Sequence, residues 1–95
     1  MITAEEMCAL QEKLQEQELA KRIDDTLNQH KENLERNAFL PAECIIPKIP
    51  LSLLPSVKET ILANMENLGY DARFKKSAYD DYNVLELKWS KKKGD

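Results

Sequence analysis

The sequence predicts an α+β fold, in which a long N-terminal amphipathic helix precedes a small β-α-β-β unit. Three observations predict this fold. Apolar residues recur at helical spacing over residues 7–34, a more aliphatic helical repeat covers 53–68, and two segments of alternating apolar and polar residues follow. At 95 residues, the chain has room for one structural domain. We expect a helical arm over 1–37 and the β-α-β-β unit over 38–95.

The N-terminal helix is expected to begin at Thr3, because Glu6 stands three residues later, in the spacing of a capping box. No proline or glycine interrupts residues 4–40, and a helix of about 34 residues would be about 50 Å long. The polar run at 15–18 divides its apolar stripe into two parts that are out of phase by one position, so we expect a slip, a bend or a short break there. The apolar positions are Met7, Leu10, Leu14, Ala20, Ile23, Leu27, His30 and Leu34.

Such a helix is longer than a folded chain of this size is wide, so part of its stripe needs a cover beyond the small sheet unit. Three arrangements remain open: self-association as a coiled coil, folding back over the C-terminal part, and contact with a different protein. We expect a homo-oligomer. His30 is expected to be a packed or half-exposed structural residue. The residues expected to line the self-association seam are Leu10, Leu14, Ile23, Leu27 and Leu34.

The C-terminal unit is expected to begin with an edge strand over residues 43–50. Its β-branched residues favour extended backbone, while Pro47 and Pro50 remove donors from a strand ladder. A helix over 53–68 follows, with Ser52 or Ser56 as its N-terminal cap and Gly69 as its left-handed C-terminal cap. Its aliphatic stripe predicts packing in a core.

Two antiparallel strands are expected to complete the unit. Residues 70–75 alternate between apolar and charged side chains, and residues 85–89 do so after a polar connection over 77–81. The resulting apolar face would pack on the helix at 53–68. The unit by itself would have a small core, which again favours assembly.

Charge is unevenly distributed along the chain. Residues 1–47 hold five basic and ten acidic side chains, and residues 48–95 hold nine and seven, within an overall formal charge of −3. These opposite ends favour cross-subunit attraction, and the acidic balance argues against a protein that coats nucleic acid. The alternative interpretation is nucleic-acid or nucleotide binding by the basic C-terminal hairpin, beside the lysine run at 91–93. Its candidate contacts are Arg73, Lys75, Lys76, Tyr79, Tyr82 and Lys88.

The sequence contains no recognisable catalytic pattern. Its single histidine is not identified as a base for any nucleophile, and no glycine-rich phosphate loop, zinc ligand set or calcium loop is present. We therefore expect no enzyme activity, cofactor or metal site. Cys8 and Cys44 lack ligand spacing and are expected to be reduced thiols. Because neither a secretory leader nor a membrane-spanning apolar run is visible, we expect a cytoplasmic protein without membrane contact.

The endings of the last helix and the hairpin resemble those of small tailed-phage proteins. The resemblance rests on Leu68-Gly69-Tyr70-Asp71-Ala72-Arg73 and Val84-Leu85-Glu86-Leu87-Lys88-Trp89, and it covers residues 43–90. It implies a phage-encoded α+β protein in which Gly69 caps a helix and Tyr70 and Trp89 fill an edge of the core, without an active site. By analogy, it implies binding to a host or virion protein in the host cytoplasm. The two prolines of the first strand and the long polar first helix depart from this pattern.

Overall fold

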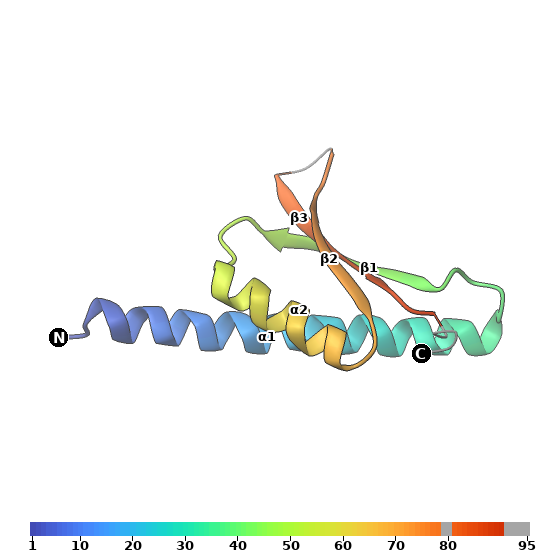
Figure 1. Ribbon diagram of the computed structural model, residues 1–95, viewed down its shortest axis with the longest axis horizontal. Helices are drawn as coiled ribbons and strands as arrows, with labels where there is room; N and C mark the ends of the chain where they lie inside the picture. The colour runs from blue at the N-terminus through green and yellow to red at the C-terminus, as the bar shows by residue number, and fades with distance from the viewer. Residues whose placement is uncertain (79–80, 91–95) are drawn as a thin grey trace.

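The computed structural model describes residues 1–78 and 81–90. Helix α1 (Ala4–Arg36) is followed by β1 (Glu43–Pro50), α2 (Pro55–Asn67), β2 (Asp71–Lys76) and β3 (Tyr82–Lys88). The α+β class and the β-α-β-β order are confirmed. The strands form one antiparallel sheet in the order β1-β3-β2, so β1 is an edge strand, as its prolines predicted (Figure 1).

Helix α1 is continuous over its 33 residues, so a short break near residues 15–18, one of the expected alternatives, is wrong. Glutamine and glutamate are good helix formers, and a polar run of them does not interrupt a helix. The hydroxyl oxygen of Thr3 accepts a hydrogen bond from the amide of Glu6 at 3.1 Å, as expected for the helix start. The first turns of α1 extend beyond α2 and the sheet, in a molecule that measures 54 × 34 × 23 Å (Figure 1).

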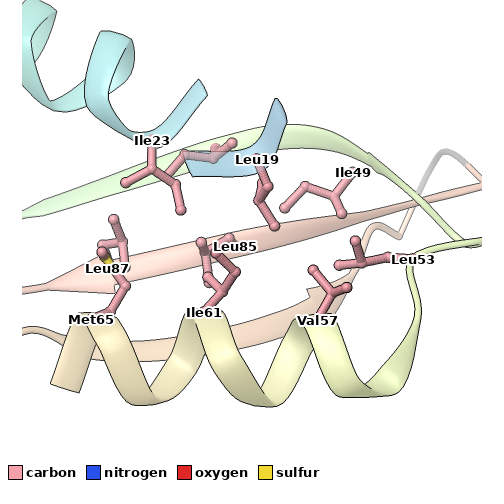
Figure 2. Close-up of a cluster of buried hydrophobic side chains, with 10 residues drawn as sticks. Leu19, Ile23, Ile49, Leu53, Val57, Ile61, Met65, Leu85 and Leu87 are labelled. Atoms are coloured by element: carbon pink, nitrogen blue, oxygen red, sulfur yellow. The ribbon is translucent and has the colours of Figure 1, made fainter. Parts of the chain in front are cut away.

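Both helices cover the same face of the sheet. Helix α1 contacts β1, α2 contacts β2, and the two helices contact each other. The core lies between them and the central strand, where Leu85 and Leu87 have no exposed surface. Figure 2 shows Leu19 and Ile23 of α1 above these leucines and Ile61 of α2 below them. The whole buried cluster is Leu19, Ile23, Ile46, Ile49, Leu53, Val57, Ile61, Met65, Leu85 and Leu87.

Leu19 is a core residue that the sequence analysis missed. The apolar repeat was assigned to Ala20, but Ala20 is exposed and Leu19 is 4% exposed. Leu19, Ile23 and Leu27 follow one another in steps of four, so they lie on one face of α1. The residue directly after the polar run therefore marks the point at which α1 enters the core.

Helix α2 ends as the sequence predicted. Gly69 has φ +95°, its amide donates to the carbonyl of Glu66 at 3.0 Å, and the amide of Tyr70 donates to the carbonyl of Met65 at 3.0 Å. These two bonds form a Schellman motif, in which glycine adopts the left-handed conformation without a Cβ penalty. The start of α2 differs from the prediction, because the N-cap is Leu54 and no side chain of its own segment caps it.

Candidate interaction surface

Gln15 connects α1 to the loop before α2. Its side-chain oxygen accepts a hydrogen bond from the amide of Leu54 at 2.9 Å, and its side-chain nitrogen donates to the carbonyl of Ser52 at 3.2 Å. A residue from the run that was expected to break α1 therefore serves the start of α2, in place of the expected serine caps. This contact could not be predicted from the sequence, because its partners are 39 residues apart and no local pattern links them.

Arg22 connects α1 to an irregularity in β1. The register of β1 against β3 shifts between Ile46 and Ile49, and Lys48 within this bulge has φ +56°. Such a left-handed conformation is uncommon for a residue other than glycine. The guanidinium of Arg22 donates to the carbonyl of Lys48 at 3.0 Å, so α1 stabilises the bulge. The bulge and the two prolines protect β1 against pairing with another strand.

The N-terminal arm, defined as residues 1–14, makes a different surface. Met7, Leu10 and Leu14 are 53%, 48% and 54% exposed, whereas Leu19 and Ile23 are 4% and 2% exposed. Single exposed leucines are normal on a protein surface, but three apolar residues on one face of a projecting helix form a contiguous stripe. We call Met7, Leu10 and Leu14 the arm stripe.

The arm stripe lies on the opposite side of α1 from the core-facing residues. Successive residues of an α-helix are about 100° apart, so nine residues correspond to a half-turn around the axis. Leu10 and Leu19 are nine residues apart, and so are Leu14 and Ile23. The change of face is larger than the slip of one position that the sequence indicated. Because α1 is continuous, the protein's own core cannot cover the arm stripe.

The five residues expected to form one seam therefore belong to different surroundings. Ile23 is buried in the core and Leu27 packs against it, so the structure does not leave them for a second copy. Leu34 is half-buried beside a groove of about 470 Å³ next to Trp89. A single seam through all five residues is wrong, because it would need two sides of the helix at once. Only Leu10 and Leu14 remain exposed at the arm.

An apolar groove lies where the arm joins the rest of the molecule. Its volume is about 220 Å³, and Gln15, Glu18 and Arg22 stand among its lining residues. Leu14 belongs to both the groove and the arm stripe, so the apolar surface continues from one to the other. The apolar lining of the groove is Leu14, Leu19, Ile49, Pro50 and Leu53.

The face of the sheet opposite the helices carries alternating charges. The carboxylate of Glu86 lies 2.9 Å from the amine of Lys75 and 3.3 Å from that of Lys88. The hydrogen bond from Lys75 is the main reason why the pKa of Glu86 lies below its ordinary value, and the bond from Lys88 acts in the same direction. Arg73 pairs with Glu86 in the strand register. The carboxylate therefore neutralises part of the basic field expected on the hairpin.

The candidate nucleic-acid contacts are only partly brought together. Strand alternation places Arg73, Lys75 and Lys88 on this outer face, together with Tyr82, which is 42% exposed. Lys76 is paired with Asn83, and the same alternation points it toward the other face. Tyr79 and the lysine run at 91–93 lie outside the described residues.

His30, Tyr70 and Trp89 form an aromatic cluster beside the core. The rings of His30 and Trp89 are 5.1 Å apart between centroids, those of Tyr70 and Trp89 are 6.0 Å apart, and both pairs meet edge to face. Within the described part of the chain, Nε2 of His30 is buried without a hydrogen-bond partner. The packing agrees with the structural role expected for His30, and Tyr70 packs against the core as the resemblance implied.

Neither cysteine has the features of an activated nucleophile. Both are free thiols, Cys8 exposed and Cys44 buried. The pKa of Cys8 is raised, first by its hydrogen bond to Glu12, and burial raises the pKa of Cys44. A reactive cysteine needs the opposite shift, because the thiolate is the nucleophile.

The arrangement of this surface is suited to association, through an exposed apolar stripe, a connected groove and a charged sheet face. Across residues 1–78 and 81–90, no cluster of three His, Cys, Asp or Glu side chains is placed to hold a metal ion. In the same residues, no helix is both long enough and apolar enough to span a membrane.

The similarity to tailed-phage proteins stays a prediction. No family model, curated protein or solved structure matches the chain.

Proposed function

We propose that the protein acts without catalysis, through protein–protein association: it pairs with a second copy of itself and binds a partner protein. The observation that carries the proposal is the arm stripe. Its three apolar side chains are about half exposed, and none of them belongs to the core that the rest of α1 helps to form.

Two arms can cover each other if they pack antiparallel about a twofold axis near Leu10. Met7 of each copy then lies toward Leu14 of the other, so the same patch serves both partners and the interface closes at two copies. The antiparallel arrangement also sets the two helix dipoles in opposite directions, which is favourable. The groove that shares Leu14 with the stripe offers further apolar contact.

The expected association is weak. Burial of the exposed half of one Leu or Met contributes about 1 kcal/mol, so six such side chains contribute about 6 kcal/mol before the cost of association. Residues 1–14 carry three glutamates and one lysine, and their repulsion opposes pairing slightly. The cost of association offsets most of the contribution from the stripe, so the dimer also depends on apolar contact in the groove. We expect it only at about 100 μM chain or above, and the monomer at low micromolar concentration.

Sedimentation equilibrium over this concentration range tests the proposal. Leu10→Asp should abolish the dimer and leave the unfolding of the dilute monomer unchanged, because this side chain is not part of the core. Ala9→Asp is the matched control, since it adds the same charge to the arm on the side away from the stripe. Wild type that stays monomeric at about 500 μM would reject self-association, and an equal loss of dimer in both variants would reject the arm stripe as its interface.

Binding of a different protein is tested separately, by capture from a lysate of a plausible bacterial host with wild type and Leu10→Asp as baits. A partner retained by wild type and identified by mass spectrometry supports the second part of the proposal.

The alternative, nucleic-acid or nucleotide binding by the hairpin, has less support because Glu86 lies between Lys75 and Lys88.

A further inference from the structure

We propose that the free edge of β2 is a binding site for an extended acidic segment of another protein, which adds to the sheet as a fourth strand. This inference is independent of the arm stripe. It starts from the strand order β1-β3-β2, in which β2 pairs with β3 on one side and no described element pairs with its other side.

The two edge strands of the sheet differ in how accessible they are to a further strand. In β1, the bulge, two prolines and the hydrogen bond from Arg22 obstruct a further strand. In β2, six consecutive residues pair with β3 in a continuous register, and the strand contains neither proline nor glycine. Alternate amide and carbonyl groups of such a strand point outward at hydrogen-bonding spacing, which is the template that strand addition uses.

The charges around this edge identify the chemistry of the occupant. The six residues of β2 include Arg73, Lys75 and Lys76 against a single acid, Asp71. On the helix side of the strand, the amine of Lys58 in α2 lies 5.8 Å from the centroid of the Phe74 ring. Cations therefore stand on both faces of the edge. An incoming strand with acidic residues meets complementary charge on either face.

The edge also offers apolar contact at alternate positions. Ala72 and Phe74 are half-buried and pack against the core from its margin. An added strand would place every second side chain over this margin and the others over the outer face, where Arg73 lies. The preferred ligand is therefore an extended segment in which acidic residues alternate with β-branched ones.

A second copy fits the same edge less well. In the two antiparallel pairings that use most of β2, Arg73 faces itself when it lies on the twofold axis, and it faces Lys75 of the other copy when Phe74 lies there. Like charges directly opposite destabilise a sheet. The first pairing also sets Asp71 against Lys75, but this lysine already pairs with Glu86. A pairing about Ala72 would set Asp71 against Arg73, but only residues 71–73 of the two strands would then pair with each other. A nucleic-acid strand is disfavoured because it lacks the regularly spaced amide and carbonyl groups that pair with the free edge of a strand.

Fluorescence anisotropy with a labelled peptide of about eight residues, alternating glutamate and valine, tests the proposal. We expect saturable binding to the wild-type chain and a loss of at least about tenfold in affinity for Arg73→Glu. Lys13→Glu is the matched control, because it reverses an exposed charge on the arm, and it should bind as wild type does. The same peptide with N-methylated alternate amides should bind weakly, because it keeps the charge and loses the ladder donors.

Several results would overturn the proposal. The proposal is wrong if wild type does not bind at about 1 mM peptide, or if it binds the N-methylated peptide with equal affinity. It is also wrong if a thymidine oligonucleotide displaces the labelled peptide at a lower concentration than the unlabelled peptide does. A self-dimer lost in Arg73→Glu but kept in Leu10→Asp would assign the edge to a second copy. Arg73→Gln, which keeps a polar side chain, replaces Arg73→Glu if the latter does not fold. Hydrogen exchange should slow at β2 amides when the peptide binds.

Discussion

The two ends of α1 have similar composition and opposite surroundings. Both carry apolar side chains at steps of three and four among many charged residues. Leu10 and Leu14 are nevertheless about half exposed, whereas Leu19 and Ile23 are almost fully buried. The difference is one of direction, because the apolar stripe moves to the other side of the helix across the run at 15–18. One continuous helix therefore serves two surfaces, with the core on one side and an uncovered stripe on the other.

A polar interruption in an apolar repeat need not mark the end of a helix. Gln15 keeps its helical backbone and uses its side chain to bond the loop before α2. The interruption instead separates a segment that is fixed to the sheet from a segment that is not. Four predictions test how complete this separation is, in order of decreasing effect.

The largest contrast is expected between Ile23→Ala and Leu10→Ala. Ile23→Ala should lower the free energy of unfolding by about 2–5 kcal/mol, because it leaves a cavity among buried side chains. In dilute protein, Leu10→Ala should change it by no more than about 0.5 kcal/mol. Urea unfolding at about 1 μM chain measures both values. Similar losses in the two variants would show that the arm packs on its own chain.

Gln15→Ala should have the next largest effect. It removes the acceptor of the partly buried Leu54 amide, so unfolding should become easier by about 1–2 kcal/mol and this amide should exchange faster. Gln17→Ala, at an exposed position two residues further along the same helix, is the control and should be close to neutral. If both substitutions had the same effect, the contact with the loop would contribute nothing.

Thr3→Ala should act on the arm alone. Loss of the cap to the Glu6 amide should weaken the first turn of α1 by about 1 kcal/mol. We expect faster amide exchange in the first turns with no change in the global unfolding midpoint, because these turns lie outside the core. A lowered midpoint would indicate that the arm unfolds together with the rest of the chain.

The last prediction concerns the reactivity of the two thiols, and it involves no change in stability. A thiol-specific reagent at neutral pH should modify Cys8 rapidly and Cys44 only after denaturation, since the first is exposed and the second buried. The reaction of Cys8 should become faster as pH rises, because its pKa is raised and only the thiolate reacts. Cys8→Ser should remove the rapid phase. A rapid phase that persists in this variant would mean that the core at β1 opens easily.

Much of the fold could be predicted from local patterns. Thr3 and Gly69 act at the helix ends where the sequence placed them, and the prolines of β1 predicted an edge strand. These features depend on neighbouring residues, so the local sequence contains the information. The surface of α1 was harder to predict. Spacing alone assigned Leu14 and Ile23 to one seam. If α1 is continuous, these two residues lie half a turn apart around its axis, but an expected break between them made this relation unknown.

Local patterns in the chain specify the elements, their order and the apolar repeats that define them, since capping, propensity and alternation act over a few residues. The packing of helices and strands against one another sets which repeat enters the core, which strand edge stays open and how charges meet across strands. Gln15 with Leu54, Arg22 with Lys48 and Lys75 with Glu86 are contacts between separate elements. Such contacts depend on the relative placement of helices and strands in space, which no local spacing specifies.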